Sequence, residues 1–280
     1  GLAAGKGVVL AATAEEAVAA ARGMLQGEAF GEAGRRVVVE ELLEGEEASF
    51  ICLVDGRNAL PFATSQDHKA AYDGDSGPNT GGMGAYSPAP VVTPEVHRRV
   101  MEQVIEPTVR GMAAEGAPYV GFLYAGLMID GEGRPRVVEF NCRMADPETQ
   151  PIMARLKTDL VDLVEAALAG KLDEASAEWD RRVALGVVLA ASGYPEAPRK
   201  GDVISGLEHK SEDVYVFHAG TADKDGAIVT AGGRVLCVTA LGDSIREAQG
   251  KAYEAIARIQ FAGMQYRRDI GHHALNRIRA

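Results

Sequence analysis

Two pairs of apolar runs, each folded around a tight Asp-Gly turn, limit what this chain can fold into. Residues 48–64 contain two such runs around Asp55, and residues 121–142 contain two around Asp130. Runs of this length around such turns predict antiparallel hairpins. With separate helices elsewhere in the chain, hairpins indicate an α+β fold. The predicted strands are 37–41, 48–54, 59–64, 121–129, 136–142, 183–191, 214–219 and 235–239.

Residue patterns in other segments of the chain predict helices. Thr13 and Glu16 have the spacing of a capping box and predict a helix that begins there. Thr93 followed by proline opens a second helix, which runs toward residue 112 and is expected to be disturbed at Pro107. Gly170 is the expected end of a helix that starts near Thr158. A last helix is predicted at 243–261.

The length, charge and composition of the chain exclude several classes of protein. The chain has 280 residues, of which 46% are apolar, which suffices for one large or two medium domains. Its net charge of −11 argues against a nucleic-acid partner, because phosphate backbones would be repelled. We find no apolar run long enough to span a membrane and no signal-peptide pattern at the start. A composition shift near residue 182 suggests two domains, 1–185 and 186–280.

The cysteines indicate the compartment. Cys52, Cys142 and Cys237 lie far apart in apolar, strand-like runs. This pattern is typical of reduced, buried thiols and predicts a cytoplasmic protein without a disulfide frame or a zinc site.

Residues 65–90 are rich in Gly, Asp, Pro and Asn and show no periodicity, which predicts a long structureless loop. Loops of that length inside a compact domain are usually functional. The loop carries Asp67, His68 and Lys69, followed by a glycine-rich run at 77–84. Such a combination suits an anionic substrate that the backbone must approach closely.

The run Glu139-Phe140-Asn141-Cys142-Arg143 combines an apolar strand with polar chemistry. Strand alternation places Glu139, Asn141 and Arg143 on one face. A carboxylate and a carboxamide oxygen two residues apart are ligands suited to Mg²⁺, and Arg143 could stabilise a transferring phosphoryl group. The alternative is an edge strand with a polar outer face.

Two further segments could contact a nucleotide. Residues 1–7 form a glycine-rich loop in which Gly5, Lys6 and Gly7 could surround phosphates, although an ordinary glycine turn has the same composition. Residues 38–47 run from a strand into a cluster of carboxylates that could meet an adenine edge and ribose hydroxyls. A solvated acidic turn is the alternative there.

Together these segments resemble the glycinamide ribonucleotide synthetases, members of the ATP-grasp superfamily. The resemblance extends over essentially the whole chain, and residues 77–90 and 146–150 are more specific to this family than to the superfamily. The stretches that carry it are 1–9, 39–50, 66–90, 138–150 and 265–275.

The resemblance implies an ATP-grasp fold, with the nucleotide between two antiparallel sheets, followed by a small β-rich α+β domain. Residues 40–43 would grip adenine, mainly through the main chain of Glu41 and Leu43 after Glu40, and Glu47 would bind ribose. Residues Glu139 and Asn141 would bind Mg²⁺ or Mn²⁺, and Arg143 would face substrate or phosphate.

The implied reaction activates glycine with ATP as an acyl phosphate. The amine of 5-phosphoribosylamine then attacks, giving glycinamide ribonucleotide, ADP and phosphate. The alternatives are another ATP-grasp carboxylate–amine ligase and an inactive nucleotide-binding fragment. We expect small-molecule partners and a monomer, and the sequence leaves an oligomer open.

The chain departs from the family pattern in several places. In the family, the glycine-rich loop follows a Lys-Ala-Asp sequence whose lysine reaches the ATP phosphates, and an N-terminal domain helps to form the phosphoribosylamine site; the resemblance implies that the given sequence starts after both. We therefore expect the chain alone to aggregate, to bind ATP weakly and to lack ligase activity. Leu127 stands where many ATP-grasp enzymes have another metal-binding carboxylate. Ala70 and Met144-Ala145 replace the commoner Arg and Phe-Gly.

Overall fold

The computed structural model describes residues 7–27, 31–209 and 211–277. The chain divides into two compact units, residues 1–44 and residues 45–280. Among the described residues, no helix combines the length and the apolar character that crossing a membrane requires.

The first unit contains α1 (Ala14–Leu25) and a short 3₁₀ helix, η1 (Gly31–Arg35). The predicted capping box is confirmed: the Thr13 hydroxyl accepts from the Glu16 amide, and the Glu16 carboxylate accepts from the Thr13 amide. The strand predicted at 37–41 is wrong, since no strand pairs with this extended segment in the described part of the chain. Val38 and Val39 are accordingly 75% and 81% exposed.

The second unit begins with a four-stranded antiparallel sheet, and both predicted hairpins are confirmed within it. The central strands β1 and β7 pair along their whole length, from Glu46 opposite Ile129 to Asp55 opposite Val120. In spatial order the strands are β2 (Ala59–Pro61), β1 (Glu46–Asp55), β7 (Val120–Ile129) and β8 (Pro135–Asn141).

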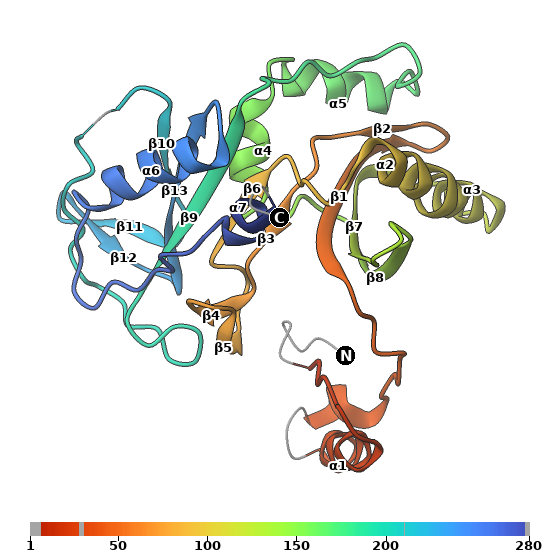
Figure 1. The fold of residues 1–280 in the computed structure, drawn as a ribbon, viewed down its shortest axis with the longest axis horizontal. Coiled ribbons are helices and arrows are strands. Elements are labelled where there is room, and N and C mark those ends of the chain that lie inside the picture. Colours follow the sequence, from red (N-terminus) through yellow and green to blue (C-terminus); the bar gives the residue numbers. More distant parts are fainter. Residues whose placement is uncertain (1–6, 28–30, 210, 278–280) are drawn as a thin grey trace. The chain divides into compact units, whose positions relative to one another are not determined.

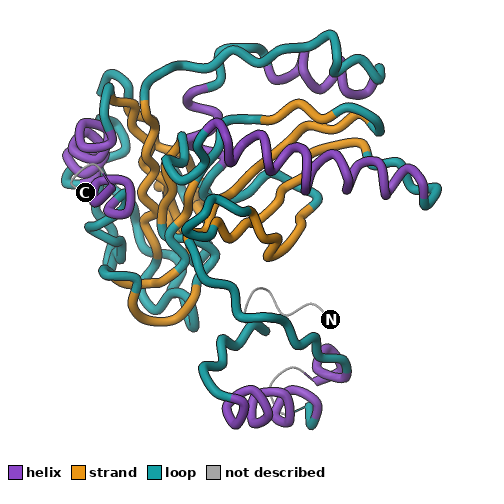
Figure 2. The backbone as a smooth tube through the Cα atoms, turned by 45° about the vertical axis from the view of Figure 1, so that its right-hand side comes forward, coloured by secondary structure: helices purple, strands orange, loops and turns teal. Residues whose placement is uncertain are grey.

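One face of this sheet packs against a long helical segment, which Figure 2 shows running beside the strands. The segment consists of α2 (Pro94–Val100), the π-helical η2 (Met101–Ile105) and α3 (Glu106–Ala114). The expected disturbance at Pro107 is confirmed by the π-helical turn directly before α3. Pro107 has no amide hydrogen and its ring would collide with the carbonyl four residues back, so a regular α-helix cannot continue through it.

The opposite face of β1 and β7 packs against α4 (Thr149–Arg155) and α5 (Leu160–Leu168) through a core that includes Ile51, Leu53, Ile152 and Leu163. Gly170 follows α5 with φ +68°, as its predicted role at the helix end requires.

A five-stranded antiparallel sheet forms the other half of the second unit, at the left of Figure 1. The helices α6 (Ile245–Ile256) and α7 (His272–Arg277) contribute buried residues to its core. The predicted domain boundary at residue 185 falls inside β9, which pairs with strands from both sides of that boundary. In spatial order the strands are β10 (Val214–His218), β13 (Arg234–Gly242), β9 (Val183–Ala190), β6 (Gly84–Ser87) and β3 (Gln66–Asp67).

Residues 65–90 are not structureless, which corrects the sequence prediction. They contain β3 and β6, together with a small hairpin of β4 (Ala70–Tyr72) and β5 (Ser76–Asn79). A second hairpin, β11 (Thr221–Lys224) with β12 (Ala227–Thr230), was also not predicted. These strands have four residues or fewer, too short for a periodic pattern to reveal.

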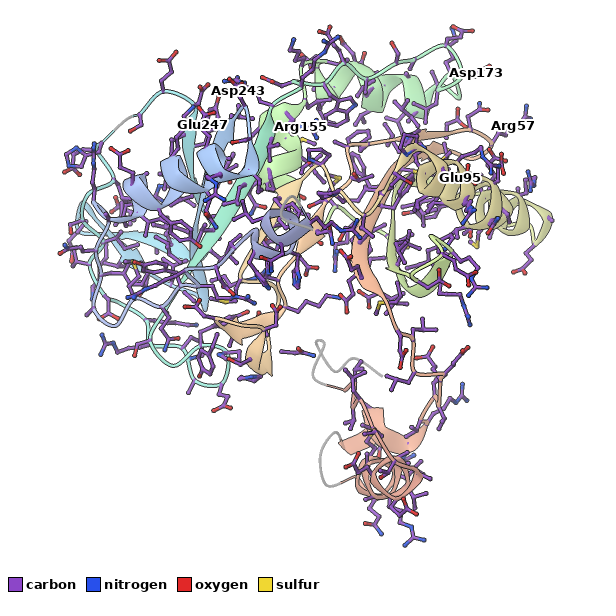
Figure 3. All side chains as sticks on the ribbon, in the orientation of Figure 1. Arg57, Glu95, Arg155, Asp173, Asp243 and Glu247 are labelled. Carbon is purple, nitrogen blue, oxygen red and sulfur yellow. The ribbon has the colours of Figure 1, made fainter. Side chains whose placement is uncertain are left out.

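The interior contains a buried arginine and two of the three cysteines. Arg155, labelled beside α4 in Figure 3, is buried and donates to the Ser87 hydroxyl and to the carbonyls of Asp180 and Arg182. Cys52 and Cys237 are buried as predicted, but Cys142 is exposed. It follows the edge strand β8, most of whose residues are solvent-exposed.

The core of the second unit predicts that two leucines contribute very differently to the stability of the protein. Leu53 in β1 is 2% exposed and Leu168 in α5 is 75% exposed. Leu53→Ala should lower the free energy of unfolding by about 2–5 kcal/mol, because it leaves a cavity. Leu168→Ala should change it by less than about 0.5 kcal/mol. Urea denaturation of both variants measures the difference, and equal effects would contradict the assigned core.

Candidate active site

A small cleft opens where the four-stranded sheet meets β3. Its walls come from β1, β7 and β8 on one side and from the start of the 65–90 segment on the other. The residues that line it are Glu47, Ala48, Ser49, Asp67, Lys69, Tyr124, Gly126, Leu127, Val138 and Glu139.

A backbone bridge between Ser49 and Ser65 builds this cleft. The Ser49 amide donates to the Ser65 carbonyl (2.8 Å), and the Ser65 amide donates to the Ser49 carbonyl (3.2 Å). The Gln66 side chain adds a 3.0 Å hydrogen bond to the Glu47 carbonyl. These contacts hold the segment that carries Asp67 and Lys69 against β1.

Strand alternation sorts the side chains of β1 and β7. Ala48 and Phe50 belong to the core under α2 and α3, so Glu47 and Ser49 point to the other face, toward the cleft. On β7, Gly126 leaves space for Glu139, because a Cβ there would lie 3.3 Å from the Glu139 Cγ.

Lys69 and Glu47 form an ion pair with a 2.6 Å Nζ–Oε2 distance. Burial by itself would lower the pKa of Lys69, but the negative charges of Asp67 and Glu47 raise it above its ordinary value. Lys69 therefore carries its positive charge throughout the neutral range, which supplies a fixed cation at the cleft wall.

Asp67 lies beside the buried Glu148. Burial and then the charge of Glu148 raise the pKa of Asp67 to about 8, and the positive charge of Lys69 opposes this only in part. Burial likewise raises the pKa of Glu148, whose carboxylate accepts a 2.8 Å hydrogen bond from Ser49. The Ser49 hydroxyl also lies 3.1 Å from the hydroxyl of Tyr124. These two carboxyl groups cannot both ionise easily so close together.

Glu139 and Asn141 lie together, as alternation along β8 predicts. The Asn141 amide donates to the Glu139 carboxylate over 3.0 Å. Their oxygen atoms can therefore reach one ion, and an oxygen-only donor set suits Mg²⁺ or Mn²⁺. The Arg143 guanidinium lies 5.8 Å from the centre of the Tyr124 ring, near the same cleft.

The structure explains why position 127 holds a leucine and not a metal-binding carboxylate. Although its backbone borders the cleft, the Leu127 side chain is 1% exposed and packs into the core under α2 and α3. A carboxylate at this position would enter an apolar interior without a partner, at a cost of several kcal/mol, on the order of the desolvation penalty for an ion.

His68 is not brought into the cleft with Asp67 and Lys69. Its ring is buried, its Nε2 accepts a 3.0 Å hydrogen bond from the Gly271 amide, and burial lowers its pKa to about 4. In this arrangement the His68 side chain links the 65–90 segment to the C-terminal segment.

The remaining predicted nucleotide contacts belong to the first unit. Gly5 and Lys6 lie outside the described residues, while Gly7 is described. Glu40 and Glu41 are exposed and Leu43 is half-buried. Their roles toward adenine and phosphate, and that of Glu47 toward ribose, stay predictions.

Sequence reasoning missed Ser49, Tyr124 and Glu148 as members of the site. Glu148 lies within the family-specific stretch 146–150, which was a usable signal, whereas Ser49 and Tyr124 sit in apolar strands that look like pure core. Outside the cleft, the Arg234 guanidinium donates to the carbonyls of Gly81 and Asp146 (2.6 and 2.7 Å) and thereby ties the two loops that carry them to β13.

The fold places this chain among the ATP-grasp proteins. The structure is similar to the biotin carboxylase domain of a 2-oxoglutarate carboxylase from Hydrogenobacter thermophilus, solved in complex with MgADP, with a TM-score of 0.68 and 16% identity. That match covers 94% of this chain and 56% of the other, and shows the fold alone.

The chain belongs to the phosphoribosylglycinamide synthetase family: residues 1–149 match its ATP-grasp (A) domain and residues 184–273 its C domain. It is 65% identical to the phosphoribosylamine–glycine ligases of Vibrio vulnificus and Pseudomonas aeruginosa. These matches cover 99% and 100% of this chain. A crystal structure of the Thermotoga maritima phosphoribosylamine–glycine ligase matches with a TM-score of 0.87 and 39% identity, over 96% of this chain and 67% of that one. The chain spans about 65% of the length of the curated relatives.

The raised pKa of Asp67 predicts a pH dependence of stability. The folded protein keeps this proton up to about pH 8, whereas the unfolded chain loses it near the ordinary value of 3.8. Stability from this group is therefore lost as the pH rises between those values. Asp67→Asn should remove this loss, so that the variant gains stability relative to the parent from about pH 5 to about pH 8.

Urea denaturation at several pH values measures this difference, with Asp173→Asn at an exposed aspartate as the control. Parallel curves for the parent and Asp67→Asn would show that Asp67 ionises normally in the folded protein.

Proposed function

We propose that this chain forms the ATP-binding and C-terminal part of a ligase that joins glycine to 5-phosphoribosylamine. Its membership of the phosphoribosylglycinamide synthetase family and its 65% identity to phosphoribosylamine–glycine ligases support the reaction. The observation that carries the proposal is the cleft, which has Glu139, the partner of Asn141, on one side and the charged Lys69 on the other. The overall reaction consumes ATP and yields glycinamide ribonucleotide, ADP and phosphate.

The divalent ion, Mg²⁺ or Mn²⁺, would be held by Glu139 and Asn141. When bound, such an ion offsets negative charge on nucleotide phosphates during phosphoryl transfer. Leu127 contributes no ligand, because its side chain points into the core. The protein's ligands in this proposal are therefore these two residues of β8.

Lys69 and Arg143 supply the positive charge that the reacting groups need. The γ-phosphoryl group of ATP is transferred to the glycine carboxylate, and the resulting acyl phosphate is attacked by the amine of 5-phosphoribosylamine. Lys69 is charged at neutral pH and held by Glu47, so it can orient an anionic substrate without prior reorganisation. Asp67 adjoins Lys69 and, with a pKa of about 8, can take a proton from an attacking amine in the weakly alkaline range.

The organisation proposed for the chain keeps an ATP-grasp part at 1–185 and a C-terminal part at 186–280. The proposed nucleotide contacts in the first unit are Gly5, Lys6, Gly7 and residues 40–43. Small molecules are the proposed partners, and the cytoplasm is the proposed compartment, where ATP and purine precursors are found.

The proposed function predicts that ligase turnover depends on the negative charge of Glu139. Glu139→Gln keeps the size of the side chain and removes its negative charge, so ligase turnover should fall by about a hundred- to a thousandfold, as for other lost electrostatic contacts in active sites. Glu132→Gln, in the exposed β7–β8 turn, is the matched control and should retain turnover. The measurement is ADP release that depends on both glycine and phosphoribosylamine, made on the full-length gene product.

Near-parent turnover of Glu139→Gln would exclude the proposed metal site. ADP release with other carboxylates but not with glycine would indicate a different ATP-grasp ligase. Absence of any substrate-dependent ADP release would favour a nucleotide-binding protein without ligase activity.

A further inference from the structure

Three histidines and an aspartate meet where the turn of the β4–β5 hairpin touches the start of α7. The ligand atoms of His68, Asp75, His272 and His273 all lie within 4.8 Å of one another. They come from segments about 200 residues apart in the sequence, so the fold alone brings them together. Neither the proposed reaction nor the cleft uses Asp75, His272 or His273.

The hairpin turn is fixed to the C-terminal segment by two hydrogen bonds at the residues directly before Asp75. The Arg268 amide donates to the Asp73 carboxylate (2.7 Å), and the Gly74 amide donates to the Asp269 carboxylate (2.9 Å). The turn that carries Asp75 is therefore held in place before any ligand arrives, which lowers the conformational cost of binding one.

His272 faces hydrogen-bond acceptors with both of its ring nitrogens. Nδ1 lies 3.1 Å from the Asp269 carbonyl oxygen, which can only accept, so Nδ1 carries the hydrogen. Nε2 lies 3.1 Å from Asp75 Oδ2, a second acceptor. A neutral imidazole has only one N–H, so with Nδ1–H facing the Asp269 carbonyl the Nε2 lone pair faces Asp75 Oδ2 and can bind a metal ion. A histidine whose Nδ1–H is fixed by a carbonyl is the usual form of a metal ligand.

His273 converges on the same oxygen. Its Nε2 lies 3.0 Å from Asp75 Oδ2, and its ring lies 3.9 Å from that of His272, centre to centre. In a tetrahedral site with bonds of 2.0–2.1 Å, neighbouring ligand atoms are roughly 3.3 Å apart. The two observed nitrogen–oxygen distances are close to that value.

His68 completes the support of Asp75 without being a ligand itself. Because its Nε2 accepts from the Gly271 amide, its Nδ1 carries the hydrogen and offers no lone pair. This Nδ1 is buried, has no hydrogen-bond partner within the described part of the chain, and lies 3.7 Å from Asp75 Oδ1. Arg267 donates to the same Oδ1 over 2.8 Å. Arg267 and His68 thus both face Oδ1, and Oδ2 is the oxygen available to an ion.

The charges favour a divalent cation. The carboxylates of Asp75 and Asp269 contribute two negative charges and the buried Arg267 one positive charge, which leaves one negative charge beside the rings of His272 and His273. Two imidazoles with one carboxylate suit Zn²⁺, Co²⁺, Ni²⁺ or Cu²⁺ much better than Mg²⁺.

We propose that His272 Nε2, His273 Nε2 and Asp75 Oδ2 bind one divalent transition-metal ion of the Zn²⁺ type, separate from the candidate active site. The ion ties the β4–β5 turn to α7. Since the hairpin directly follows Lys69, the ion also steadies the segment that leads into the cleft.

The test uses tag-free, chelator-treated protein titrated with Co²⁺, whose visible absorption reports its coordination, and then with Zn²⁺ in competition. We expect one equivalent of Co²⁺ to bind, excess Mg²⁺ to leave it in place, and Zn²⁺ to displace it. His272→Ala and His273→Ala should each raise the dissociation constant by at least about tenfold, since even the loss of an outer-shell partner costs that much. His218→Ala, at an exposed histidine bonded to Thr221, is the control and should bind like the parent.

Asp75→Asn provides a second variant, because asparagine tolerates the left-handed backbone of this position, where φ is +53°. It should also weaken Co²⁺ binding while circular dichroism shows a folded protein. Absence of stoichiometric binding by the parent would overturn the proposal. So would binding that all of these substitutions at the site leave unchanged, which would place the ion elsewhere.

Discussion

The antiparallel bridge between Ser49 and Ser65 is the contact on which the candidate active site depends. It joins the four-stranded sheet to the segment that enters the five-stranded sheet, and it does so with two backbone hydrogen bonds of 2.8 and 3.2 Å. Backbone bonds fix position regardless of side chain. Because the bridge lies two residues from Glu47 and four from Lys69, it sets the geometry of that ion pair.

The cleft concentrates charge that the chain as a whole would not supply. The net charge of −11 repels an anionic nucleotide, so binding requires local cations and a metal. Near neutral pH the ion pair with Glu47 keeps Lys69 charged, while burial and the nearby Glu148 raise the pKa of Asp67 so that it retains its proton. Burying these groups costs free energy that their mutual contacts only partly recover, and such an arrangement is typical of functional sites.

The sequence predicted the features that local chemistry determines and missed those that distant contacts create. The capping box at Thr13 and the helix disturbance at Pro107 depend on neighbouring residues, and both were predicted. The strand at 37–41 was wrong, because an apolar run forms a strand only where another strand can pair with it. His68 looked like a substrate residue beside Lys69. Its actual surroundings come from a segment about 200 residues later, which no local pattern reveals.

A crystal structure with Mn²⁺ and an unhydrolysable ATP analogue tests the central claim most directly, since the anomalous scattering of manganese locates the ion. The account predicts an ion in contact with the side-chain oxygens of Glu139 and Asn141, with the phosphates between this pair and Lys69. A nucleotide whose phosphates and metal ion lie away from β8 and Lys69 would contradict the assignment of this cleft as the active site.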